Sequence, residues 1–188
     1  MIRRTAVEIV ANPYPGPFSE ITDFRYETGL MLLRFRNAVQ VRDGEDADYV
    51  VGAEYRVSFK VDGRPFEVVV PPGLLTDLVS VHWIARWLVS RVGPYLEAAI
   101  VHDYLYVAWQ SIDGQGARPE DRRFADTVMA GAMKEAQVSW LRRVLIYGAT
   151  RVFGNATYTT RKPDRYVSLD TEDVIAQFPN GGGRSRIA

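Results

Sequence analysis

The sequence predicts an α+β fold, in which an N-terminal antiparallel β-sheet packs on about three C-terminal helices. Two observations lead to this prediction. Residues 54–61 alternate between apolar and polar side chains, which is the period of a half-buried strand. After the run Pro71-Pro72-Gly73, apolar residues recur at helical spacing instead. A length of 188 residues suits one domain. We expect it to span residues 1–154, with an extended tail over residues 155–188 that is ordered by partners.

The composition excludes several classes of protein. Hydrophobic residues make up 47% of the chain and charged residues 24%, as in ordinary globular proteins. The formal net charge is zero and no basic-aromatic signature is present, so the sequence predicts no nucleic-acid binding. The absence of cysteine excludes disulfides, thiolate metal sites and a cysteine nucleophile. No apolar stretch approaches the roughly 20 residues of a transmembrane helix, and early prolines argue against a signal peptide.

The clearest strand signal is a hairpin. The alternating residues 54–61 are followed by Asp62-Gly63, a dipeptide that favours a two-residue hairpin turn. Residues 66–70 then form the returning strand, and Pro71-Pro72-Gly73 is expected to end the sheet, because proline cannot donate to a strand ladder. Further strand candidates lie on either side of a proline-rich loop, at residues 5–10, 24–26 and 30–36.

The second half of the chain carries helical signals. Residues 78–92 suit a helix or an irregular helical turn, which Gly93-Pro94 ends. Residues 94–109 suit the next helix, because proline is well placed in a first helical turn. Residues 119–136 suit another, since Pro119-Glu120-Asp121 places acids near the positive end of the helix.

The last long helix is predicted over residues 139–153, closed by Gly154. Its apolar residues recur at helical spacing, and we expect them to form an inner stripe against the core. This stripe consists of Leu141, Val144, Leu145, Gly148 and Val152. The tail beyond carries one short helical signal near residues 170–178 and ends in a glycine-rich run, which is flexible unless a partner holds it.

His102 and Asp103 are the strongest candidates for chemistry. They stand in an apolar helical stretch, where an ionisable group is costly to bury unless it has a partner. Tyr106 lies one helical turn beyond and shares their face. The alternative is structural, with a buried histidine and aspartate satisfied by backbone groups in the core.

Two further acids are placed to join this pair. Asp126 lies on the next predicted helix, and two helices joined by a short loop usually pack antiparallel. Its alternative role is a local ion pair with Arg122 or Arg123. Asp77 follows the proline-glycine run, where it is placed either to cap a helix or to serve as an oxygen ligand beside the other acids.

Three motifs in this order resemble the domain-of-unknown-function family numbered 1353. They are Val70-Pro71-Pro72-Gly73 with Thr76-Asp77-Leu78-Val79-Ser80-Val81, then Ala98-Ala99-Ile100-Val101-His102-Asp103-Tyr104-Leu105-Tyr106, then Asp121-Arg122-Arg123-Phe124-Ala125-Asp126. The likeness covers roughly residues 55–154, and His82 departs from it, because the family usually has proline there. The family is common in phage and prophage genomes. The resemblance therefore implies a virion or tail component that is located in the virion or the host cytoplasm and has other virion proteins as partners.

A second pattern, His-Asp-x-x-Tyr on one helix and Asp on the next, is similar to that of phospholipases A2. The resemblance implies His102 as general base, Asp103 as calcium ligand and Asp126 as the acid that orients the histidine. The chain lacks that family's disulfides and a clear glycine-rich calcium loop. The order of His82, His102-Asp103 and Asp126 also matches metal phosphohydrolases of the HD type, but those proteins are all-helical.

The sequence therefore favours a phage or prophage virion-associated structural protein, from a tail or connector region, with a buried His-Asp-Asp cluster. The alternative is a calcium-dependent hydrolase, phospholipase A2-like or cell-wall-directed. In that alternative, His102, Asp126 and Tyr106 are catalytic, and Asp103 and Asp77 hold the metal. Assembly with further copies of the chain is left open.

Overall fold

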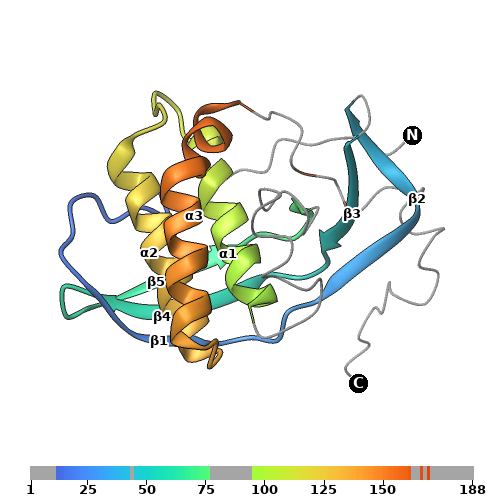
Figure 1. The fold of residues 1–188 in the computed structure, drawn as a ribbon. Helices are drawn as coiled ribbons and strands as arrows, with labels where there is room; N and C mark the ends of the chain where they lie inside the picture. Colours follow the sequence, from blue (N-terminus) through green and yellow to red (C-terminus); the bar gives the residue numbers. More distant parts are fainter. Residues whose placement is uncertain (1–11, 43–44, 77–94, 162–165, 167–168, 170–188) are drawn as a thin grey trace, which may run out of the picture.

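The computed structural model describes residues 12–42, 45–76, 95–161, 166 and 169. Within these residues six strands precede three α-helices, as the predicted α+β class requires (Figure 1). The strand candidate at residues 5–10, the helical segment 78–92 and the tail helix at 170–178 lie outside the described residues.

The strands form two antiparallel sheets rather than the single predicted sheet. The first contains β1 (Ile21–Tyr26), β4 (Tyr55–Val61) and β5 (Arg64–Val70), with β4 in the middle. The second contains β2 (Leu32–Arg42), β3 (Glu45–Val51) and β6 (Leu75–Thr76), with β3 in the middle. Strand β5 ends at Val70, so Pro71-Pro72-Gly73 ends the first sheet as predicted, and the chain then joins the second sheet through β6.

The predicted hairpin is confirmed in strands β4 and β5. The turn residues Asp62 and Gly63 both have positive φ, 49° and 78°, as a type I′ turn requires. The alternate residues of β4 that were predicted to share a face are buried. The Asp62 carboxylate also accepts hydrogen bonds from the backbone N–H groups of Ser19 and Glu20, at 3.0 and 2.9 Å. The hairpin turn therefore also holds the segment that leads into β1.

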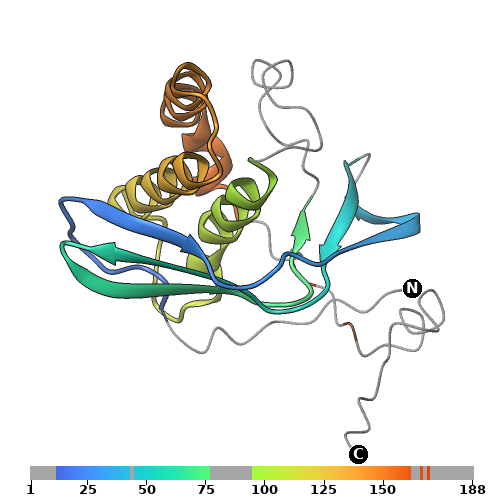
Figure 2. The same cartoon turned by 90° about the horizontal axis from the view of Figure 1, so that it is seen from below.

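The helices stack in two layers on one face of the first sheet. Helices α1 (Leu96–Val107) and α2 (Pro119–Glu135) lie next to the sheet, and a 3₁₀ turn, Ala108–Ser111, extends α1. Helix α3 (Trp140–Thr159) packs on α2 and α1, on the side away from the sheet (Figure 2). No helix in the described ranges combines the length and hydropathy needed to cross a bilayer.

An aromatic core joins α2 to the sheet. The ring of Phe124 lies 5.5 Å from Phe18, 5.9 Å from Phe59 and 5.8 Å from Phe66, between centroids. Each such buried ring contributes roughly 1.5–3 kcal/mol through removal of apolar surface from water. This packing fixes the face that α2 turns toward the sheet, and hence the face that it turns toward α1 and α3.

Helix α3 differs from its predicted form in two ways. It continues through Gly154 to Thr159, so the first residues assigned to the tail belong to a helix. The predicted inner stripe is also wrong: Leu141 is 60% exposed and Val152 is 69% exposed. The buried residues of α3 are Ile146 and Tyr158, which lie on another side of the helix.

Candidate functional site

Asp126 is the centre of a buried polar cluster between the three helices. His102 of α1 places its Nε2 atom 3.0 Å from the Asp126 Oδ1 atom, and Tyr106 donates its hydroxyl to the same oxygen at 2.7 Å. The imidazole and phenol rings lie 4.0 Å apart between centroids. The predicted approach of Asp126 to His102 is therefore confirmed, and Tyr106 shares the face of His102 as its i+4 spacing requires.

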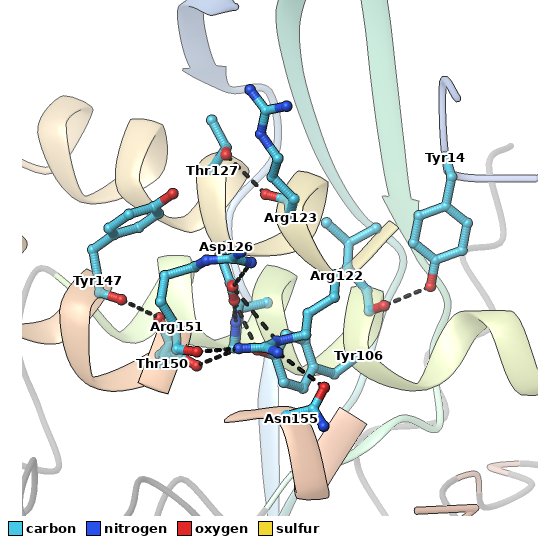
Figure 3. A network of polar contacts seen from close by, with 12 residues as sticks. Tyr14, Tyr106, Arg122, Arg123, Asp126, Thr127, Tyr147, Thr150, Arg151 and Asn155 are labelled. Atoms are coloured by element: carbon cyan, nitrogen blue, oxygen red, sulfur yellow. Dashed lines mark hydrogen bonds and ion pairs between the residues drawn. The ribbon is translucent and has the colours of Figure 1, made fainter. Parts of the chain in front are cut away.

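Two arginines complete this group, which we call the Asp126 cluster (His102, Tyr106, Arg122, Asp126 and Arg151). Arg151 of α3 donates to the Asp126 Oδ2 atom at 3.1 Å, and the Nε atom of Arg122 lies 3.9 Å from the same oxygen. Figure 3 shows the two arginines converging on Asp126 from α3 and α2. The local pair with Arg122 therefore exists together with the contact to His102, whereas Arg123 lies over the Phe18 ring.

Arg122 also holds α3 in place. Its guanidinium donates to the Asn155 side chain at 3.0 Å and to the backbone carbonyls of Thr150, at 3.2 Å, and Arg151 (Figure 3). A planar guanidinium suits this role, because its several donors point in fixed directions. The same side chain therefore compensates the charge of Asp126 and binds the helix that supplies Arg151.

The carboxylate of Asp126 is held in its ionised form. Its side chain is fully buried, and burial by itself raises the pKa of a carboxyl group. The hydrogen bond and charge of His102, with the hydrogen bonds of Tyr106 and Arg151, outweigh burial and lower the Asp126 pKa below its ordinary value. Burial and the neighbouring Asp126 charge raise the pKa of Tyr106, so its hydroxyl stays protonated as a donor.

Gly154 allows α3 to approach the cluster. A Cβ atom at this position would lie 2.6 Å from the Tyr106 hydroxyl oxygen, well inside van der Waals contact. The missing side chain at Gly154 therefore lets α3 pack closely on Tyr106. The prediction that Gly154 closes the helix is wrong, because α3 continues to Thr159.

Asp103 points away from the Asp126 cluster. Successive residues of a helix are about 100° apart, and the Asp103 Oδ2 atom accepts a hydrogen bond from the hydroxyl of Thr76 in β6 at 2.8 Å. The structure therefore separates the two aspartates, which the predicted His-Asp-Asp cluster had grouped. His102 and Asp126 face one another between the helices, while Asp103 faces the second sheet.

The remaining predicted site residues, Asp77 and His82, lie outside the described residues. Within the described ranges, no three histidine or acidic side chains gather as a metal site would need. Asp103 is the one predicted metal ligand within the described ranges, and its carboxylate accepts a hydrogen bond from the Thr76 hydroxyl.

The arrangement of His102 is that of an oriented imidazole. In the neutral ring, a proton on Nε2 directed at Asp126 leaves the lone pair on Nδ1, so a fixed aspartate selects the tautomer. The histidine side chain is 10% exposed, while the Asp126 side chain is fully buried. The cluster can therefore either hold His102 in position as a base or join the three helices through buried polar contacts that have only a structural role.

The contribution of α3 to this site is not among the predictions from the sequence. Arg151 and Asn155 follow Val144 and Gly148 by seven residues, about two helical turns, so they share a side of α3 with two residues of the predicted inner stripe. Their own spacing of one helical turn was a usable signal for polar contacts from that side. The apolar residues of the stripe gave the stronger pattern, and that pattern predicted core packing rather than polar contacts.

Comparison with known proteins yields one match. The sequence profile of the family described as Protein of unknown function (DUF1353) matches residues 51–150, more than half of the chain. No curated protein and no solved structure matches the chain. The matched region includes β4, β5, α1 and α2, and hence His102, Tyr106 and Asp126. The family description assigns no activity and names no virus or phospholipase.

Proposed function

The chain belongs to the DUF1353 family, whose description gives no activity, and from the Asp126 cluster we propose that it is a hydrolase in which His102 acts as general base. The observation that carries this proposal is the 3.0 Å contact between His102 Nε2 and the fully buried Asp126 carboxylate. A general base needs a fixed ring and a defined tautomer, and a buried acceptor supplies both.

The second nitrogen of His102 is the proposed reactive atom. In the proposed reaction, Nδ1 takes a proton from water, and the water oxygen attacks the carbonyl carbon of an ester. The ester C–O bond breaks, and the imidazolium returns the proton to the departing alkoxide, which gives an acid and an alcohol. Asp126 and Tyr106 position the ring, while Arg122 and Arg151 balance the permanent charge of Asp126.

A calcium ion is not assigned a step in this reaction. Asp103 and Asp77 remain the proposed metal ligands, and the Asp103 carboxylate accepts a hydrogen bond from the Thr76 hydroxyl. Calcium takes six to eight oxygen ligands, and no group of three acidic or histidine side chains placed to hold a metal ion lies within the described ranges. Calorimetric titration of the wild type and Asp103→Asn with calcium tests this part separately.

The test compares hydrolysis by wild type and His102→Gln. We expect the wild type to release fatty acid from phospholipid vesicles or soluble fragments from cell-wall peptidoglycan. His102→Gln should lower that rate roughly 10²–10⁴-fold, the range for loss of a general base. Asp113→Asn is the matched control, because Asp113 is an exposed residue of the loop between α1 and α2 and is not a member of the cluster. Circular dichroism melts of each variant separate loss of activity from loss of folding.

The absence of hydrolysis by the folded wild type on both substrates would reject the enzymatic proposal. The structural reading then remains: the Asp126 cluster ties three helices together, and the chain is a virion-associated structural protein. One observation favours this second candidate, namely the exposed apolar residues of α3, since an assembly component needs an uncovered surface. Mass spectrometry of purified particles from a host that carries the gene checks whether the chain is retained in virions.

A further inference from the structure

The exposed large apolar side chains of the described residues are concentrated on α3. All of them except Met31 belong to this helix. They are Trp140, Leu141, Val144, Leu145, Val152 and Phe153, with exposed fractions between 39% and 69%. Helix α3 is also the outermost layer on its side of the sheet (Figure 2). Contiguous apolar surface of this kind marks an interaction site.

One side of α3 is apolar along most of the helix. We call this side the outward face, which consists of Leu141, Leu145, Ala149, Val152 and Phe153 together with Arg142. At about 100° of rotation per residue, these positions span roughly 120° around the helix axis, which is the width of the stripe that a helix ordinarily buries. Arg151 and Gly154, which contact the Asp126 cluster, lie on the opposite side. The outward face therefore points away from the domain.

The charges of α3 are all positive. Its charged residues are Arg142, Arg143 and Arg151, and no acidic residue occurs in Trp140–Thr159. Arg142 is exposed within the outward face, and the Arg151 side chain is 38% exposed although it also pairs with Asp126. An occupant of the outward face therefore meets apolar side chains beside positive charge, which a surface with negative charge complements. The same charges would repel a second copy of the helix.

A bilayer that contains anionic lipids provides both kinds of contact. Helices that lie in the membrane interface insert apolar side chains at the acyl boundary, and their basic side chains attract anionic headgroups. Arginine suits this position, because its apolar stem packs with the acyl chains while the guanidinium reaches the phosphates. Trp140, the first residue of α3, is 69% exposed, and tryptophan is enriched at membrane–water interfaces. A fluid surface also needs no groove to fit the convex side of one outermost helix (Figure 2).

We propose that α3 is a membrane-docking helix, whose outward face lies in the interfacial region of a bilayer that contains anionic lipids. In this orientation the helix axis is parallel to the membrane plane, and the first sheet is on the side of the domain away from the lipid. Leu141, Leu145 and Val152 enter the acyl boundary, while Arg142 contacts lipid phosphate. The proposal does not depend on the hydrolase activity, because docking is measured without hydrolysis.

Co-sedimentation of the full chain with vesicles tests the docking. We expect the wild type to bind vesicles of phosphatidylcholine and phosphatidylglycerol in equal parts. Binding to pure phosphatidylcholine should be about tenfold weaker, and high salt should weaken binding to the anionic vesicles by screening the charges. Leu145→Glu should lower the binding constant on the order of tenfold or more, because it replaces an inserted side chain with a negative charge. Arg142→Gln should lower it about fivefold.

Thr22→Glu and Arg64→Gln are the matched controls for these two variants. They make the same changes of charge at exposed positions of β1 and β5, on the first sheet rather than on α3. Their binding constants should stay near that of the wild type.

A fluorescent label identifies the side of the chain that contacts lipid. The chain contains no cysteine, so Leu145→Cys and Thr22→Cys can each carry one label whose emission depends on its surroundings. We expect the emission from position 145 to shift to shorter wavelength when anionic vesicles are added, while the emission from position 22 stays unchanged.

A wild type that does not bind anionic vesicles at low salt overturns the proposal, as does equal binding by Arg142→Gln, Leu145→Glu and the two controls. Self-association through Leu145 without binding to vesicles would overturn it in favour of a second copy. A loss of unfolding free energy for Leu145→Glu as large as that for a buried residue would overturn it as well, because another part of the chain would then cover the outward face.

Discussion

The contacts that hold α3 to the domain differ in kind from the side chains that α3 exposes. Toward α1 and α2 the helix presents Arg151 and Asn155, which bind the polar Asp126 cluster, together with Gly154, which leaves room for Tyr106. Its exposed side chains include five large apolar ones, Trp140, Leu141, Val144, Leu145 and Val152. A surface helix ordinarily buries its apolar residues and exposes its polar ones. The difference indicates that directed polar contacts contribute much of the attachment of α3 to the domain.

Removal of Asp126 should have the largest effect on the inner side. Asp126→Ala leaves His102, Tyr106 and the two arginines without their common acceptor. Loss of one partner from a buried ionic group costs about 3–5 kcal/mol. Urea denaturation followed by circular dichroism measures the free energy of unfolding. Asp113→Ala, in an exposed loop, should change it by no more than about 0.5 kcal/mol; equal effects of the two variants would show that the cluster contributes nothing.

Truncation of one buried and one exposed apolar residue of α3 should lower the free energy of unfolding by different amounts. Ile146 is buried, at 5% exposure, so Ile146→Ala should lower the free energy of unfolding by about 2–5 kcal/mol. Leu141 is 60% exposed, so Leu141→Ala should lower it by only about 0.5 kcal/mol. Both losses are measured by urea denaturation. A loss for Leu141→Ala as large as that for Ile146→Ala would mean that Leu141 is covered in the folded chain.

Substitution of two glycines of α3 by alanine should change the stability of the chain in opposite directions. Gly154→Ala pushes the Tyr106 hydroxyl away from Asp126, and we expect a loss of about 1–3 kcal/mol from overpacking. Gly148→Ala adds its methyl group in open space, and the better helix propensity of alanine should stabilise the chain by about 0.5–1 kcal/mol. Thermal melts recorded side by side decide the signs; stabilisation by both substitutions would contradict the close approach of α3.

The pH dependence contributed by Asp126 should be the smallest of these effects, because burial offsets part of the stabilisation of its charge. Its pKa in the folded chain is lowered from 3.8, so its contribution to stability is present above that pH and is lost as the pH falls through the folded pKa. Denaturation curves at pH 7 and in the acid range, for wild type and Asp126→Asn, measure it. The wild type should lose more stability on acidification than the variant does.

Local patterns in the sequence were sufficient for the elements that depend on local physics. The Asp62-Gly63 turn and the alternation of β4 are set by neighbouring residues, and both are confirmed. The pairing of His102 with Asp126 was also predictable, because consecutive helices with a short connection usually pack together. Strand β6, with only two residues, was too short to produce a period.

The orientation of α3 could not be predicted from its own sequence. Apolar spacing identifies a face of a helix but not the surface that covers it. The decisive contacts of α3 come from Arg122, on another helix, through carbonyl groups that every residue carries. Contacts to backbone carbonyl groups do not depend on residue type, so the spacing of residues does not reveal them. For this reason the apolar pattern alone assigned Leu141 and Val152 to the core.

The β4–β5 turn has a consequence for the order in which the chain folds. A two-residue hairpin closes within microseconds, because few residues separate its strands. Strand β1 pairs with β4 across some thirty intervening residues, and closing such a loop carries a larger entropic cost. The Asp62 carboxylate, already fixed in the turn, then offers a ready acceptor for the N–H groups of Ser19 and Glu20. We therefore expect the hairpin to form first and to act as the template on which the N-terminal segment docks.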